Sequence, residues 1–167
     1  MRRVAWLAVG FIALGLALGG SPVAGEQWGG VEPGVSTMPM VRGLRGSPTR
    51  TVRQKVDGYD TAEWIYEDAK APPGIRRMTV AFGLKTADGY RPELVRSFKL
   101  EPKAVAFDKD WITAGWGAPS GVGQDGDNEF FFYKEGLFVY FDQDGHGVRS
   151  MLFTPPQLPP ADASPQP

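Results

Sequence analysis

Short runs of apolar and aromatic residues in the middle and at the end of the chain predict β-strands. They fall into two groups of three: residues 62–68, 76–83 and 93–100, then 128–134, 137–142 and 147–153. The segments between these runs contain proline, glycine and Asp-Gly, which favour turns. Each group therefore predicts an antiparallel meander of three strands.

A short helix is predicted ahead of each group. In "VSTMPMVRGLRG", Ser36 is the expected N-cap, and apolar residues spaced three apart share one helical face. In "FDKDWITAGWG", the expected N-cap is Asp108. Gly46 and Gly117 each lie two residues before a proline, and glycine readily adopts the left-handed conformation that closes a helix. We therefore expect these two glycines to end the helices.

The two halves of the chain show the same order of features. "VEP" at 31–33 corresponds to "LEP" at 100–102, and "GSP" at 46–48 corresponds to "GAP" at 117–119. In each half a charge-rich or glycine-rich loop then leads to an aromatic strand. This internal similarity predicts an α+β fold of two tandem helix–β-meander units, which form an antiparallel sheet with short helices on one face.

Both ends of the chain differ from the middle. Residues 1–25 combine a basic start, an uncharged apolar run and small residues, which is typical of a secretory signal peptide. We therefore expect an exported protein, periplasmic or extracellular, and leave open whether the signal is cleaved or retained. Residues 26–99 and 100–157 would form the two units, and the Pro-rich stretch 158–167 a disordered tail.

Composition excludes several classes of partner. The chain of 167 residues has no cysteine, so it has neither disulfides nor a lipid anchor on cysteine, and no stable membrane anchor is expected after signal cleavage. Without Arg2 and Arg3 of the signal, 16 basic and 19 acidic residues remain. This balance provides no positive field for nucleic acid.

The first half resembles a known family. Its helix, Gly-x-Pro and Trp-x-Tyr pattern is similar to that of the SmpA/OmlA (BamE-like) outer-membrane assembly family, at Gly34, Ser36, Val41, Gly46, Pro48, Trp64 and Tyr66. The tandem arrangement resembles that of the β-lactamase inhibitory protein. The resemblance implies a non-catalytic, protein-binding role in cell-envelope assembly or as an inhibitor-like binder. The acylated cysteine of the lipoproteins and the disulfides of the inhibitors are absent, so neither the anchor nor the β-lactamase target carries over.

Two acidic loops are candidates for calcium: "FDQDGHGVRSM", with Asp142 and Asp144, and "GQDGDNE", with Asp125 and Asp127. If Asp142 is the first EF-hand position, the twelfth, where EF-hands have glutamate, is Phe153. The Asp-Gly pair and the strand-like flanks instead favour a hairpin turn. The second loop is more typical of a solvated connection. A calcium- or small-ligand-binding module that uses these aspartates is the alternative function.

The residues needed for catalysis are scarce. His146 is the single histidine and falls in the predicted hairpin turn, and no cysteine can act as a nucleophile. Glu67 and Asp68 are adjacent, so they would point to opposite faces of a strand. No glycine loop has the strand–loop–helix order of a phosphate-binding motif. We expect a protein that is not an enzyme and has no cofactor.

Aromatic residues provide the remaining candidate site. Residues 130–133 are consecutive aromatics and must project to both faces of a sheet, while Phe138 and Tyr140 share a face opposite to Leu137, Val139 and Phe141. Periodicity leaves open whether this second face is covered by the chain itself or exposed to a partner. We expect docking of a protein partner, whose identity the sequence does not give, on Trp64, Tyr66, Trp116, Phe132, Phe138 and Tyr140.

Overall fold

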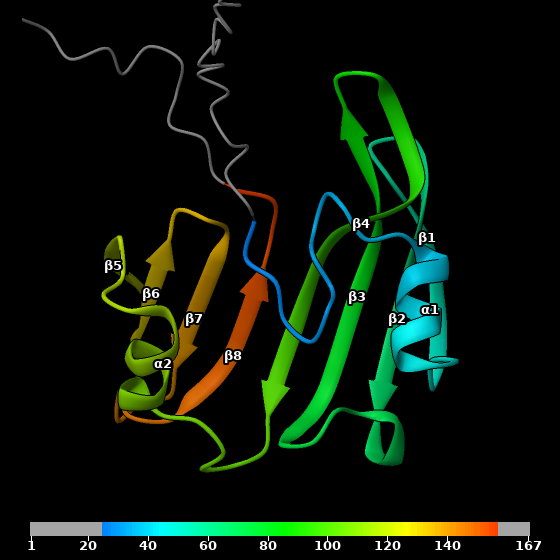
Figure 1. The fold of residues 1–167 in the computed structure, drawn as a ribbon. Coiled ribbons are helices and arrows are strands. Elements are labelled where there is room, and N and C mark those ends of the chain that lie inside the picture. Colours follow the sequence, from blue (N-terminus) through cyan, green and yellow to red (C-terminus); the bar gives the residue numbers. More distant parts are fainter. Residues whose placement is uncertain (1–24, 157–167) are drawn as a thin grey trace, which may run out of the picture.

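The computed structural model in Figure 1 describes residues 25–156. The tail prediction for 158–167 and, apart from Gly25, the signal prediction for 1–25 lie outside this range. The elements are α1 (Met38–Arg45), β1 (Arg50–Val56), β2 (Tyr59–Glu67), the 3₁₀ turn η1 (Asp68–Lys70), β3 (Ile75–Thr86), β4 (Gly89–Pro102), α2 (Lys109–Trp116), β5 (Gly121–Asp125), β6 (Asn128–Tyr133), β7 (Leu137–Phe141) and β8 (Val148–Phe153). Within residues 25–156, no helix is both long and apolar enough to cross a membrane.

All eight strands belong to one antiparallel sheet, in the order β1-β2-β3-β4-β8-β7-β6-β5 (Figure 1). Strands β4 and β8 pair directly, with Phe98 opposite Phe153 and Leu100 opposite Met151. The sheet therefore continues through the centre of the molecule without a break. The expectation of two tandem helix–β-meander units with helices on one face is wrong. The structure is one continuous eight-stranded sheet accompanied by only two short helices of 8 residues each.

The six expected strands are all present, but β1 and β5 form where the sequence predicts loops. Both lie at the edges of the sheet. Most residues of β1 and β5 are exposed, so neither strand shows an alternation of apolar and polar positions. Sequence patterning detects a strand through its buried face, and edge strands such as these have almost none.

The hydrophobic core lies on one face of the sheet, which we call the core face. Strand β7 shows the alternation clearly, because Leu137, Val139 and Phe141 are fully buried whereas Phe138 and Tyr140 between them are half-buried. This confirms the two faces predicted for this segment. The core side chains of all strands from β2 to β4 and from β6 to β8 form a single cluster, which also includes Val31, Val41 of α1 and Ile112 of α2.

The helix ends are only partly as expected. Asp108 caps α2 as predicted, since its Oδ1 accepts a hydrogen bond from the N–H of Trp111 at 2.8 Å. In α1 the N-cap is Thr37, and its side chain makes no capping hydrogen bond. Ser36 is instead buried, and its Oγ accepts from the N–H of Glu32 at 2.9 Å. The prediction of Ser36 as the cap is wrong because this hydroxyl stabilises the turn that precedes the helix.

Candidate functional site

Four half-buried aromatic side chains lie together on the sheet face opposite the core. They are Phe130 and Phe132 of β6 and Phe138 and Tyr140 of β7, and we call them the aromatic cluster. The ring centroids of Phe132 and Phe138 are 5.0 Å apart, and those of Phe130 and Tyr140 are 5.5 Å apart. Such separations are typical of favourable aromatic pairs. The cluster therefore forms one contiguous apolar surface.

Two glycines of the edge strand β5 make room for this cluster. Gly123 is paired with Phe130 and Gly121 with Phe132. A Cβ atom on Gly123 would lie 2.4 Å from Cζ of Phe130, so this ring occupies the space that any other residue would need. A Cβ on Gly121 would be 3.9 Å from the Phe132 ring, an ordinary contact. Aromatic rings that cross glycines of a neighbouring strand shield the exposed backbone there.

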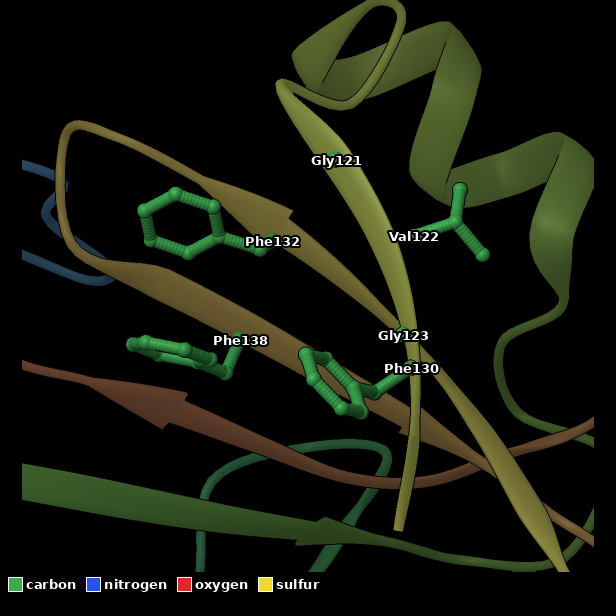
Figure 2. A pocket seen from close by; sticks show the side chains of 6 residues that line it. All are labelled: Gly121, Val122, Gly123, Phe130, Phe132 and Phe138. Atoms are coloured by element: carbon green, nitrogen blue, oxygen red, sulfur yellow. The ribbon is translucent and has the colours of Figure 1, made fainter.

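The two glycines, Val122 and three phenylalanines of the cluster line an open apolar hollow with a volume of about 400 Å³, which is within the usual range of ligand pockets. Figure 2 shows the three phenylalanine rings gathered beside β5, with Val122 pointing away from them. Val122 is 60% exposed at the rim. The lining residues are Gly121, Val122, Gly123, Phe130, Phe132 and Phe138, none of which is charged or polar. This surface suits an apolar group rather than an ion.

Basic side chains border the aromatic cluster. Lys99 of β4 is paired with Leu152 of β8, which is paired in turn with Phe138 of the cluster. A second hollow of about 340 Å³ is lined by Arg76, Lys99, Glu101, Arg149 and Ser150. Glu101 lies 2.7 Å from Arg76, 3.6 Å from Lys99 and 3.8 Å from Arg77, so one carboxylate faces three cations. The border of the apolar surface is therefore positively charged.

The structure brings together only part of the predicted docking set. Phe132, Phe138 and Tyr140 lie in the aromatic cluster, whereas Trp64 and Tyr66 are core residues with exposures of 5% and 0%. Trp64 and Tyr66 offer almost no surface to a partner.

Trp116 also lies on the core side, where it packs against Phe153 and its indole Nε1–H donates to the Glu26 carboxylate at 2.8 Å. Phe130 belongs to the cluster but is missing from the predicted docking set. The signal that could have found it is its spacing of two residues from Phe132, which places both rings on one face.

The acidic loops have structural roles. The carboxylate of Asp142 accepts hydrogen bonds from the N–H groups of His146 at 3.2 Å and Gly147 at 3.1 Å, and Gly145 has φ 72°. Residues 142–147 thus join the antiparallel strands β7 and β8, which confirms the predicted hairpin. Asp125 and Asp127 lie at the β5–β6 hairpin, and Asp125 is 3.9 Å from the Arg149 guanidinium. Across residues 25–156, no group of three acidic, histidine or cysteine side chains is arranged to hold a metal ion.

Four groups have shifted pKa values, and none of them belongs to the aromatic cluster. Burial lowers the pKa of the Arg45 guanidinium. Burial raises the pKa of the Glu26 carboxyl; the Trp116 hydrogen bond opposes this shift, and the nearby charge of Glu135 adds to it. Burial also raises the pKa of the Tyr66 and Tyr133 hydroxyls. These shifts concern stability rather than the aromatic cluster.

Comparison with known proteins finds no matching protein family and no matching curated protein. Among solved structures, a DUF4309 family protein (YjgB) from Bacillus subtilis subsp. subtilis str. 168 is similar, with a TM-score of 0.45 and 12% sequence identity. The similarity covers 75% of this chain and 82% of that chain. At this level it carries no argument about function.

Proposed function

We propose that the protein is an exported, non-catalytic interaction module that docks a protein partner on the aromatic cluster. One observation carries this proposal: the half-buried rings of Phe130, Phe132 and Phe138 line an apolar hollow of about 400 Å³, and Tyr140 extends the same aromatic surface. Large aromatic side chains dominate the binding energy of protein interfaces when a partner buries them fully. The resemblance to the SmpA/OmlA outer-membrane assembly family supports a role in the cell envelope.

The two edges of the sheet differ in a way that supports docking at β5. The edge strand β1 carries Arg50, Arg53 and Lys55, and charged side chains of this kind oppose pairing with another chain. Strand β5 has the sequence GVGQD, with a single charged residue at its end. In the described part of the chain, no strand pairs with its outer edge. We infer that the partner supplies an extended segment that lies along β5.

The geometry also indicates the chemistry of that segment. Side chains of an added strand would alternate between the two faces of the sheet, so every second one would face the aromatic cluster. A large apolar side chain of the partner would fill the hollow between the glycines of β5 and Phe138. An acidic group of the partner would be favoured near Lys99 and Arg149, at the charged border.

Site-specific photocrosslinking tests this proposal. A photoreactive phenylalanine analogue placed at Val122, on the exposed edge strand β5 along which the partner would lie, should form an adduct with one defined protein in the cells that produce this chain. The same analogue at Val105, which is 101% exposed and lies outside the hollow, is the matched control. Adducts that are identical from both positions, or absent from Val122, would contradict the proposal.

Binding of the captured protein should then depend on the side chains of the aromatic cluster. Combined Phe132→Ala and Phe138→Ala substitutions should weaken its affinity for the purified partner by at least about tenfold. The variant should retain cooperative thermal unfolding, since these rings are only half-buried. If alanine at Phe138 and Tyr140 instead costs several kcal/mol of unfolding free energy, the aromatic cluster is core and this surface is not the site.

A further inference from the structure

A second hollow lies at the other edge of the sheet, between α1 and the first two strands. Its volume is about 640 Å³, and it is lined by Met38 and Arg42 of α1, Thr51 and Arg53 of β1, and Ala62 and Trp64 of β2. An adjoining hollow of about 410 Å³ shares three of these residues and continues past Pro92. We call the two together the α1–β1 groove. It lies on the core side of the sheet and shares no residue with the aromatic cluster.

Two arginine side chains line the groove, and a ring contact holds one of them in a defined position. The guanidinium of Arg42 lies over the Trp64 ring, 5.0 Å from the ring centroid, and this cation–π contact orients it. Thr51 is paired with Trp64 and Arg53 with Ala62, so Thr51 and Arg53 project to the same side of the sheet as the tryptophan. A hydroxyl and two guanidinium groups therefore line one concave surface.

These two cations lack a partner of opposite charge. Within residues 25–156, neither Arg42 nor Arg53 makes an ion pair, whereas their neighbours in β1 do. Arg50 lies 3.9 Å from Glu67, and Lys55 lies 3.2 Å from Asp60. The adjoining hollow also contains Asp60, but this carboxylate is paired with Lys55. A concave site whose uncompensated charge has one sign attracts the opposite charge more strongly than a flat surface does. The charge of the groove therefore favours the binding of an anion.

The remaining lining of the groove is apolar. Met38 and Ala62 provide hydrocarbon surface beside the charged groups, and the nearly buried Trp64 forms the floor beneath Arg42. Pockets that combine an apolar lining with a few convergent polar groups are the usual sites of small organic ligands. Guanidinium groups bind carboxylate and phosphate through paired, charge-assisted hydrogen bonds.

We propose that the α1–β1 groove binds a small organic anion, with a carboxylate or phosphate group held by Arg42 and Arg53. The Thr51 hydroxyl donates a further hydrogen bond to the anionic group. The apolar body of the ligand lies against Met38 and Ala62, above the Arg42 guanidinium that rests on Trp64. This site is independent of partner docking at β5, because the two surfaces lie at opposite edges of the sheet.

Titration with three related aromatic compounds tests the site. Benzoate and phenyl phosphate provide the two anionic groups on the same apolar ring, and benzamide is the neutral control. We expect at least one of the two anions to bind and to shift the amide NMR signals of Thr51 and Arg53, and benzamide to bind at least about tenfold more weakly. Tighter binding of one anion than of the other distinguishes a phosphate ligand from a carboxylate ligand.

Charge-removing variants locate the anion. Arg42→Met and Arg53→Met keep the aliphatic part of the side chain and should each weaken anion binding by about tenfold. Arg50→Met is the matched control, since it removes the same charge from the same strand but on the opposite sheet face, and it should change affinity by less than about twofold. If Arg42→Met unfolds because it loses its contact with Trp64, Arg53→Met alone decides the question.

Three results would overturn the proposal. The first is that neither anion shifts the amide NMR signals of Thr51 and Arg53. The second is that benzamide binds as tightly as the anions, and the third is that Arg50→Met weakens binding as much as Arg53→Met does. The last result would mean that only the general positive charge of this edge attracts the anion. None of these results bears on crosslinking at Val122, so failure of this site is distinguishable from failure of the proposed function.

Discussion

The hydroxyl of Tyr133 donates a hydrogen bond to the carbonyl oxygen of Gly117, 3.1 Å away, and so ties strand β6 to the end of α2. Tyr66 makes the same contact with Gly46 at 3.3 Å, which ties β2 to the end of α1. Both tyrosine side chains are buried. Each short helix is thus attached to the sheet by a hydrogen bond at the glycine that follows it. Such attachment matters because two turns of helix have little stability of their own.

Tyr133→Phe is expected to lower the free energy of unfolding by about 1 kcal/mol, because it removes the hydrogen bond that the buried Tyr133 side chain donates to Gly117. The matched control is Tyr140→Phe. Tyr140 is half-buried in the aromatic cluster, and its hydroxyl makes no hydrogen bond to any other residue within 25–156. We therefore expect the free energy of unfolding to change by less than about 0.5 kcal/mol. Urea unfolding of the three proteins measures both values. Equal losses for the two variants would show that the Tyr133 contact contributes nothing specific.

Gly117→Ala should destabilise the protein by about 1–3 kcal/mol. Gly117 has φ 77° and ψ −163°, a conformation that is essentially confined to glycine. Gly115, two residues earlier within α2, has no positive φ and has open space around its Cβ position. Gly115→Ala should therefore be neutral or stabilising by up to about 1 kcal/mol, because alanine favours helix. Thermal unfolding separates the two variants, and a loss at Gly115 as large as at Gly117 would contradict this reading of the helix end.

The β5 glycines provide a second matched pair. Gly123→Ala should cost about 1–3 kcal/mol, because its Cβ would lie 2.4 Å from Phe130 and the ring would have to move. Gly121→Ala should be close to neutral, since its nearest contact is 3.9 Å from Phe132. Chemical shifts of the Phe130 ring protons provide a direct readout. Large shifts in the Gly121 variant, with none in the Gly123 variant, would be incompatible with the arrangement in Figure 2.

The sequence predicts the position of a strand only where one of its faces is buried. The alternation in β7 assigns Phe138 and Tyr140 to one face correctly, because three fully buried neighbours enforce the register. The same patterning misses β5, where glycine and exposed polar residues leave no periodic signal. The hollow exists only because β5 lies beside β6, so no argument from sequence alone could have located it.

Long-range pairing is the other part that the sequence does not predict. The local pattern predicts the strands within each half of the chain. Nothing in that pattern specifies that β4 pairs with β8, which joins the two halves into one sheet. The same limit explains Trp64. Its Trp-x-Tyr context suggests a partner contact, yet α1 covers it, and Arg42 lies on its ring. The prediction failed because local sequence does not show which element covers a strand.

Stability should depend on pH through Glu26. Burial raises the pKa of this carboxyl in the folded protein, so the folded state binds the proton more tightly than the unfolded state does. The free energy of unfolding should therefore decrease as pH rises from about 4 through the raised pKa, because the buried carboxylate must then carry its charge. Glu26→Gln cannot ionise but keeps an oxygen acceptor for the Trp116 indole. We expect this variant to unfold at a higher temperature than the wild type at pH 7, and at a similar temperature near pH 4.

Thermal unfolding at both pH values measures this effect. The chain must retain the residue before position 26, because an N-terminal glutamine would cyclise to pyroglutamate. Trp116→Phe is the informative companion, because it removes the hydrogen bond that favours the charged carboxylate. The dependence of unfolding temperature on pH should become steeper in that variant, and combining it with Glu26→Gln should abolish the added steepness. If the unfolding temperatures of Glu26→Gln and the wild type differ by the same amount at both pH values, ionisation of Glu26 does not cause the difference.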